Sequence, residues 1–135
     1  MTRATYYLVR ALVALVAIPF HEAGHALAAW LLGDPTAKLE GRLTLNPLAS
    51  VDPMGALALI LFGFGWAKPV PINPRYFRHF NRDMMLTALA GPASNLLQAI
   101  AWAVVLKLVV MLGISERFVI SVCAAGISVN LMLMA

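Results

Sequence analysis

Residues 21–25 read HEAGH, and they place two histidines and a glutamate inside an otherwise apolar stretch. In a helix, residues i and i+4 lie one above the other on the same face, so His21 and His25 can bind a single metal ion. Glu22 is rotated by about 100° from His21 around the helix axis, so it would flank the ion rather than complete its coordination. That is the position of a general base that takes a proton from metal-bound water. Zinc fits best, because it binds neutral imidazole and tolerates an open coordination position.

The alternative for these histidines is that they only form hydrogen bonds with neighbouring helices. An ionisable side chain in a membrane span costs free energy unless it is paired or hydrated, so three within residues 21–25 favour a site. Small residues share the histidine face of this helix and would let another helix approach closely. They are Ala14, Ala17, Gly24 and Ala28. By contrast, His79 has no partner at ligand spacing, and we interpret it as a loop residue.

A second polar pattern occurs in AGPASNLLQ, residues 90–98. Small and polar residues repeat there at the helical spacing i, i+3, i+4, i+7. They are Gly91, Ser94, Asn95 and Gln98. Asn95 has two interpretations: its amide could contact a substrate strand or a developing oxyanion, or it could bond to a neighbouring helix. For Ser94 and Gln98 we favour interhelical bonding, and we expect Pro92 in the first turn of its helix, where no N–H is needed.

The elements around these motifs are those of an integral membrane protein. The chain of 135 residues is 61% hydrophobic and 12% charged, with a mean hydropathy of +0.83. Long apolar segments at 6–32 and 84–112, and a third that opens at 118 and runs to 135, predict transmembrane helices. Residues 54–66 form a shorter apolar stretch that either spans or re-enters. The sequence therefore predicts one all-α, polytopic membrane domain over residues 1–135, with three to four transmembrane or re-entrant helices.

The distribution of basic residues predicts the orientation of the chain in the membrane only if the path of residues 54–66 is known. The N-terminus carries Arg3 and Arg10, and the loop at 67–83 carries four basic residues against Asp83. If residues 54–66 cross the membrane, these two regions share the cytoplasmic side. The sequence has no run of like charges and no interleaving of basic and aromatic residues, so it does not predict a nucleic-acid partner. The single cysteine, Cys123, is interpreted as a small buried hydrophobe.

Four motifs occur together in this chain: HEAGH, LTLNP with a following DP, GWAKPVPINP and AGPASN. The combination resembles the site-2 protease family of intramembrane zinc metalloproteases, and in particular its small bacterial members without a PDZ domain. The resemblance covers about residues 18–131. It implies a multi-pass protein of a bacterial or archaeal cell membrane, with a transmembrane protein as substrate. It does not fix the oligomeric state, and a homo-oligomer is one of the states left open.

The resemblance also implies roles for individual residues. His21 and His25 would be the ligands of one Zn²⁺ per chain, Glu22 the catalytic base, and Asn95 a residue near the active site. The activity implied is that of an endopeptidase that cleaves peptide bonds within or near transmembrane segments. Residues 63–74 are similar to a family segment near the substrate path.

The chain departs from the family pattern at the third zinc ligand. In the family this ligand is an aspartate in an LDG motif on a later helix, whereas this sequence ends with ISVNLMLMA. Asn130 matches an asparagine upstream of that motif and not the ligand. We therefore expect a C-terminally truncated chain, with the third ligand, an Asp, beyond residue 135. Two histidines alone fall short of the three protein ligands usual at catalytic zinc.

Two other function classes stay open. A metal-binding or metal-transporting membrane protein would also place histidines in spans, although it would need polar residues along a route across the membrane. A degenerate protease homologue would keep the helices without activity. Metal content and cleavage assays would separate these classes.

Overall fold

The computed structural model describes residues 2–66 and 68–134, and for residues 59 and 60 it describes the backbone alone. Three long helices dominate it, and they are α1 (Arg3–Leu31), α5 (Phe80–Met111) and α6 (Arg117–Met134). Shorter helices lie between α1 and α5. They are α2 (Thr36–Leu39), α3 (Pro47–Ser50), α4 (Pro53–Phe62) and the 3₁₀ turn η1 (Pro74–Tyr76). The predicted all-α class is confirmed.

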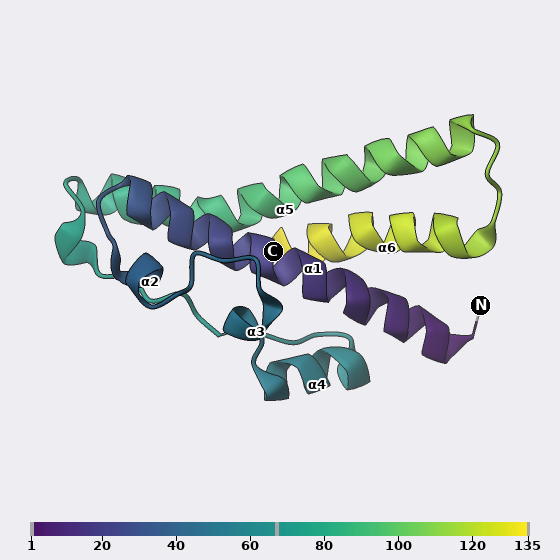
Figure 1. Ribbon diagram of the computed structural model, residues 1–135, viewed down its shortest axis with the longest axis horizontal. Helices are drawn as coiled ribbons and strands as arrows, with labels where there is room; N and C mark the ends of the chain where they lie inside the picture. The colour runs from purple at the N-terminus through teal and green to yellow at the C-terminus, as the bar shows by residue number, and fades with distance from the viewer. Residues whose placement is uncertain (1, 67, 135) are drawn as a thin grey trace.

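The three long helices pack against one another, and α2, α3 and α4 lie on the other side of α1 from α5, whereas η1 contacts α5 (Figure 1). Among the described residues, these three are the helices long and apolar enough to cross a membrane. The three predicted spans are thus confirmed within a few residues, although Ala135 lies outside the described residues. The predicted division of the chain into one domain stays a prediction.

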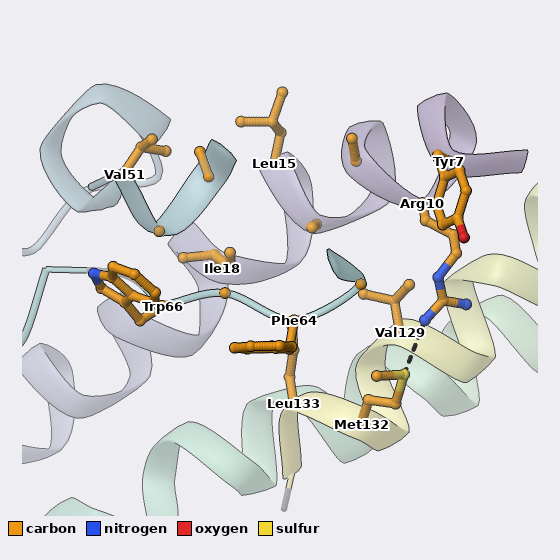
Figure 2. Close-up of a pocket in the computed structure, with 16 residues that line it drawn as sticks. Tyr7, Arg10, Leu15, Ile18, Val51, Phe64, Trp66, Val129, Met132 and Leu133 are labelled. Atoms are coloured by element: carbon orange, nitrogen blue, oxygen red, sulfur yellow. Dashed lines mark hydrogen bonds between the residues drawn. The ribbon is translucent and has the colours of Figure 1, made fainter. Parts of the chain in front are cut away.

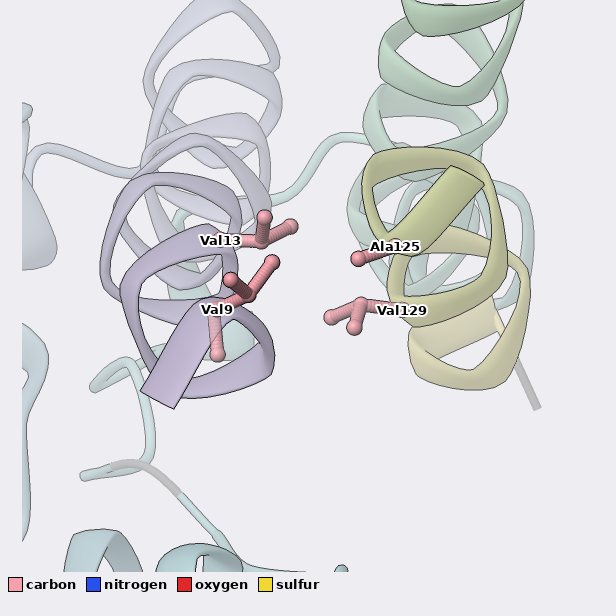
Figure 3. Close-up of a cluster of buried hydrophobic side chains, with 5 residues drawn as sticks. Val9, Val13, Ala125 and Val129 are labelled. Atoms are coloured by element: carbon pink, nitrogen blue, oxygen red, sulfur yellow. The ribbon is translucent and has the colours of Figure 1, made fainter. Parts of the chain in front are cut away.

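An apolar cluster joins the first half of α1 to α6. Val9, Val13 and Ala14 of α1 pack against Ala125 and Val129 of α6, and all five are buried (Figure 3). Cys123 of α6 is also buried and free, as its apolar setting predicted.

The short apolar segment forms a helix that is too short to cross a bilayer, and the chain then folds back beside its start. Helix α4 has 10 residues, which make it about 15 Å long, whereas the hydrocarbon core of a bilayer is about 30 Å thick. The chain also returns to its starting point, because the N–H of Lys68 donates to the carbonyl of Ser50 at 2.8 Å. Arg42 closes the same junction by donating to the carbonyls of Lys68 and Pro69, each at 2.8 Å. Since the segment does not cross, the condition for placing the N-terminus and the second loop on one side is not met.

Helix α5 begins earlier than the hydropathy pattern predicts, at Phe80 instead of residue 84. A fully buried carboxylate, that of Asp83, accepts from the backbone N–H of His79 at 3.1 Å and stabilises the first turn. The prediction that Pro92 occupies the first turn is therefore wrong, because Pro92 lies inside α5. Because proline has no N–H, the carbonyl of Ala88 lacks its usual helical donor, and α5 is missing one backbone hydrogen bond beside the polar pattern.

The loops after α1 are held to its end by Asp34. This carboxylate is fully buried and accepts from the backbone N–H of Thr36 at 3.0 Å and of Asn73 at 2.7 Å. It thereby joins two loops that are 39 residues apart in sequence. The contact keeps the connection between α4 and α5 against the end of α1 that carries HEAGH.

Candidate metal centre

The two histidines of HEAGH face each other on one side of α1. Their Nε2 atoms are 3.1 Å apart, and their rings meet at an interplanar angle of 76°. Both side chains are half-buried. The i, i+4 spacing thus brings two imidazole nitrogens to a single point, as expected for two ligands of one ion.

The ring of His25 is oriented by the backbone of α5. Its Nδ1 lies 2.7 Å from the carbonyl oxygen of Thr87. A carbonyl oxygen only accepts hydrogen bonds, so Nδ1 must carry the proton, and the Nε2 lone pair is free for a metal ion. Metal-binding histidines usually donate their other ring N–H in this way, which fixes both the tautomer and the ring orientation.

The ring of His21 is oriented by a side chain of α5. Its Nδ1 is bonded to Oδ1 of Asn95, which is fully buried. The Nδ2 of Asn95 in turn donates to Oδ1 of Asn130 on α6 at 2.9 Å. The candidate site is therefore built by three helices: α1 provides the two histidines, α5 orients both rings, and α6 bonds to the residue that orients His21.

Two glycines allow the helices to approach closely enough for these bonds. A Cβ placed on Gly91 would lie 2.6 Å from Nε2 of His21, so only glycine leaves room for the imidazoles. A Cβ on Gly24 would lie 2.9 Å from the carbonyl oxygen of Ala90. The small-residue face predicted for α1 is confirmed, since Ala14 and Ala17 are also buried.

The predicted polar stripe of α5 does face α1. Gly91 and Asn95 reach the histidines, whereas Gln98 makes longer bonds, to the carbonyl of Ala17 at 3.4 Å and to Ser94 at 3.3 Å. Gln98 thus makes the interhelical bond favoured for it, whereas the bond between Gln98 and Ser94 lies within α5 and leaves the interhelical role of Ser94 a prediction. The role of Asn95 toward an oxyanion or substrate stays a prediction, and its two polar atoms contact His21 and Asn130 here.

Glu22 is half-buried on α1, next to His21 in sequence. Among residues 2–66 and 68–134, no group of three His, Cys, Asp or Glu side chains is arranged to hold a metal ion. Two imidazoles whose Nε2 atoms lie 3.1 Å apart fit zinc as a partial ligand set. The completing ligand stays the predicted Asp beyond residue 135.

Sequence reasoning missed the part of Thr87, because a backbone carbonyl has no sequence signal. It noted Asn130 only as a match to a family asparagine. The signal that could have pointed to it is a buried amide in an apolar helix, which needs polar partners when it is inside a membrane.

Two apolar cavities border α1 at different places. One of about 330 Å³ lies between α1, α6 and residues 63–66, with Phe64 and Trp66 facing it, and none of the HEAGH residues lines it (Figure 2). The other, about 790 Å³, lies between α1, α5 and residues 43–45. Gly24 and Ser94 line this second cavity, and they precede His25 and Asn95 in sequence. Ala23 and Gly24 of HEAGH line this cavity, whereas neither histidine does.

Comparison with known proteins identifies relatives among bacterial proteins. The chain is 46% identical over 93 residues to "Putative zinc metalloprotease YwhC" of Bacillus subtilis, which covers 69% of this chain and 42% of that protein. It is 36% identical over 109 residues to "Putative zinc metalloprotease Rip2" of Mycolicibacterium smegmatis, covering 77% of this chain and 38% of the relative. A Rip2 protein of Mycobacterium tuberculosis is 38% identical over 87 residues, covering 61% and 33%. No protein-family model and no solved structure matches the chain.

These matches agree with the motif pattern and the membrane helices. The chain spans between 33% and 42% of the length of these curated relatives. The aligned part covers more than two thirds of this chain for YwhC and for the Mycolicibacterium relative. The chain belongs to the site-2 protease family, the family of these metalloprotease relatives.

Proposed function

We propose that this chain is the zinc-binding part of an intramembrane endopeptidase, in which His21 and His25 are metal ligands and Glu22 is the general base. The observation that supports this most strongly is the convergence of the two Nε2 atoms, 3.1 Å apart, with both Nδ1 atoms bonded to oxygens. With both Nδ1 atoms donating to oxygens, the two Nε2 lone pairs are directed toward one point, which is the arrangement of two ligands of one ion.

The residues of this chain have distinct tasks in the proposed reaction. Zinc, when bound, would lower the pKa of a coordinated water and polarise the scissile carbonyl. His21 and His25 would hold the ion, and Asn95 and Thr87 orient their rings. Glu22, displaced by about 100° around α1, accepts a proton from the attacking water and delivers it to the leaving amine. The third ligand is the expected Asp beyond residue 135.

The substrate proposed is a transmembrane segment of another membrane protein. The apolar cavity of about 790 Å³ lies between α1 and α5 and is large enough for several side chains of an extended peptide. The three long helices are apolar enough to cross a membrane, which supports a substrate path inside the bilayer and a multi-pass location in the cell membrane.

Zinc content provides the first test. Elemental analysis of the detergent-purified complete protein should give about one zinc per chain, and His21→Ala should lose it, because the remaining protein ligands are then too few to hold the ion. His79→Ala is a matched control, since this histidine is exposed at the start of α5. Equal zinc in the wild type and in His21→Ala would contradict the proposed ligands.

Cleavage is tested in the complete protein, because this chain spans 42% or less of the relatives it matches. Glu22→Gln should abolish cleavage of a membrane substrate while zinc content stays unchanged, since the amide cannot accept the proton. Unchanged turnover by Glu22→Gln would exclude the base assignment. Zinc flux into proteoliposomes would favour the metal-transport alternative, and bound zinc without either activity would favour a degenerate homologue.

A further inference from the structure

A chain of side-chain amides links the candidate metal centre to α6. Asn130 is fully buried, and its Nδ2 donates to the carbonyl oxygen of Gly126, one turn earlier in the same helix, at 2.7 Å. Its Oδ1 accepts from Nδ2 of Asn95 at 2.9 Å. The Oδ1 of Asn95 is left facing Nδ1 of His21.

The donor and acceptor roles in this series of hydrogen bonds are set at the carbonyl of Gly126. A backbone carbonyl can only accept, so the NH₂ group of Asn130 must point to Gly126 and its oxygen to Asn95. Asn95 must then present its NH₂ group to Asn130 and its oxygen to His21. His21 can satisfy that oxygen only with a proton on Nδ1, which leaves its Nε2 unprotonated on the metal side.

We infer that Asn130 is a positioning residue for the metal centre, and that it sets the tautomer and orientation of His21 through Asn95 without contacting the histidine. The inference rests on the proposed function, in which Nε2 of His21 binds zinc. A fixed tautomer matters there, because a ring with its proton on Nε2 cannot bind the ion through that atom.

The packing of α6 against α5 holds the carbonyl of Gly126, to which Asn130 donates, in place. A Cβ on Gly126 would lie 2.5 Å from Cε2 of Trp102, so the indole of α5 packs directly on the backbone whose carbonyl accepts from Asn130. The position of that carbonyl therefore depends on the docking of α6 against α5. His25 has no such dependence, because its partner is the backbone of Thr87 on α5 itself.

The two histidines thus supply an internal comparison in one sample. In the metal-free chain, ¹⁵N NMR of ring-labelled histidine should show the proton on Nδ1 for both His21 and His25. In Asn130→Leu, His21 should become a mixture of tautomers, because Asn95 is free to turn its amide, while His25 should not change. A proton on Nε2 of His21 in the wild type, or an unchanged His21 in Asn130→Leu, would overturn the inference.

Zinc affinity gives a second readout, by competition with a chelator. Loss of an orienting partner of a metal-binding histidine typically weakens metal binding by about 10- to 100-fold, and we expect a loss in this range for Asn130→Leu. In an Asn95→Leu background the same change should add less than about twofold, because the link is already broken. Full additivity of the two substitutions would overturn the inference.

Controls separate this effect from misfolding and from failure of the proposed function. Ser128→Ala, two residues away on α6, removes only an exposed bond to Arg10 and should leave zinc affinity unchanged. Helical content by circular dichroism should be the same in all variants compared. Absence of zinc binding in the wild type would contradict the proposed function, yet the NMR comparison in the metal-free chain would still decide the role of Asn130.

Discussion

The two halves of α1 pack against their neighbours by different means. In the first half, Val9 and Val13 contact apolar side chains of α6. In the second half, His21 and His25 contact α5 through hydrogen bonds and through the bare backbone of Gly91. One helix thus carries an apolar contact and a polar site about two turns apart.

The difference shows what each kind of contact can specify. Valine contacts are not directional, and in a membrane they compete with lipid tails that are equally apolar, so they contribute packing but tolerate small shifts. Hydrogen bonds to Thr87 and Asn95 define the rotation of each imidazole ring. We therefore expect changes in the first half to alter stability, and changes in the second half to alter metal binding.

The largest effect is expected for Gly91→Ala. The new methyl would lie 2.6 Å from Nε2 of His21 and would push the ring away from its position. Zinc affinity, measured by chelator competition, should fall by more than about tenfold, consistent with an overpacking cost of about 1–3 kcal/mol. Ala93→Val enlarges an exposed residue of the same helix turn and should have no such effect. Retained affinity in Gly91→Ala would remove the contrast between the two halves.

A smaller effect, on the other side of the comparison, is expected for Val13→Ala. This side chain is 5% exposed and packs in the α1–α6 cluster, so its removal should lower the free energy of unfolding by about 1 kcal/mol. Zinc affinity should not change. Unfolding in mixed detergent micelles measures the first quantity, with Val16→Ala as the control because Val16 is 53% exposed. A loss of zinc affinity in Val13→Ala would show that the two halves are coupled.

The smallest effect is expected for Gln98→Leu, which sharpens the boundary between the halves. The bonds of Gln98 are long, 3.4 and 3.3 Å, and interhelical hydrogen bonds in membranes contribute on average about 0.6 kcal/mol. The same unfolding assay should show a loss of about this size or less, with zinc affinity intact. A large loss of zinc affinity would place Gln98 in the site with Asn95.

Much of the architecture could be predicted from residue patterns. Three apolar segments were long enough to span, and their helices form within a few residues of the predicted limits. The pairing of His21 with His25 follows from the geometry of one helix, because a spacing of four residues is local. The close approach of α5 followed from Gly24 and Gly91, since small residues at helical spacing have few other uses in a membrane.

Contacts between distant segments could not be predicted in this way. Hydropathy alone did not decide whether residues 54–66 span or re-enter, and the bond between Lys68 and Ser50 shows that the segment folds back to its start. Pro92 looked like a first-turn proline, because the polar residues that open α5 resemble a loop until the buried Asp83 stabilises their first turn.

The candidate site also has features that follow from local sequence and features that depend on contacts between distant segments. The amino-acid sequence by itself determined which residues can bind a metal and act as a base, because His21, Glu22 and His25 lie within about one turn of helix. Only the tertiary structure decided which nitrogen atoms of the two histidines face each other. That choice depends on the backbone carbonyl of Thr87, 62 residues from His25, which no residue type reveals, and on Asn95, 74 residues from His21. Asn130 contributes through its bond to Asn95.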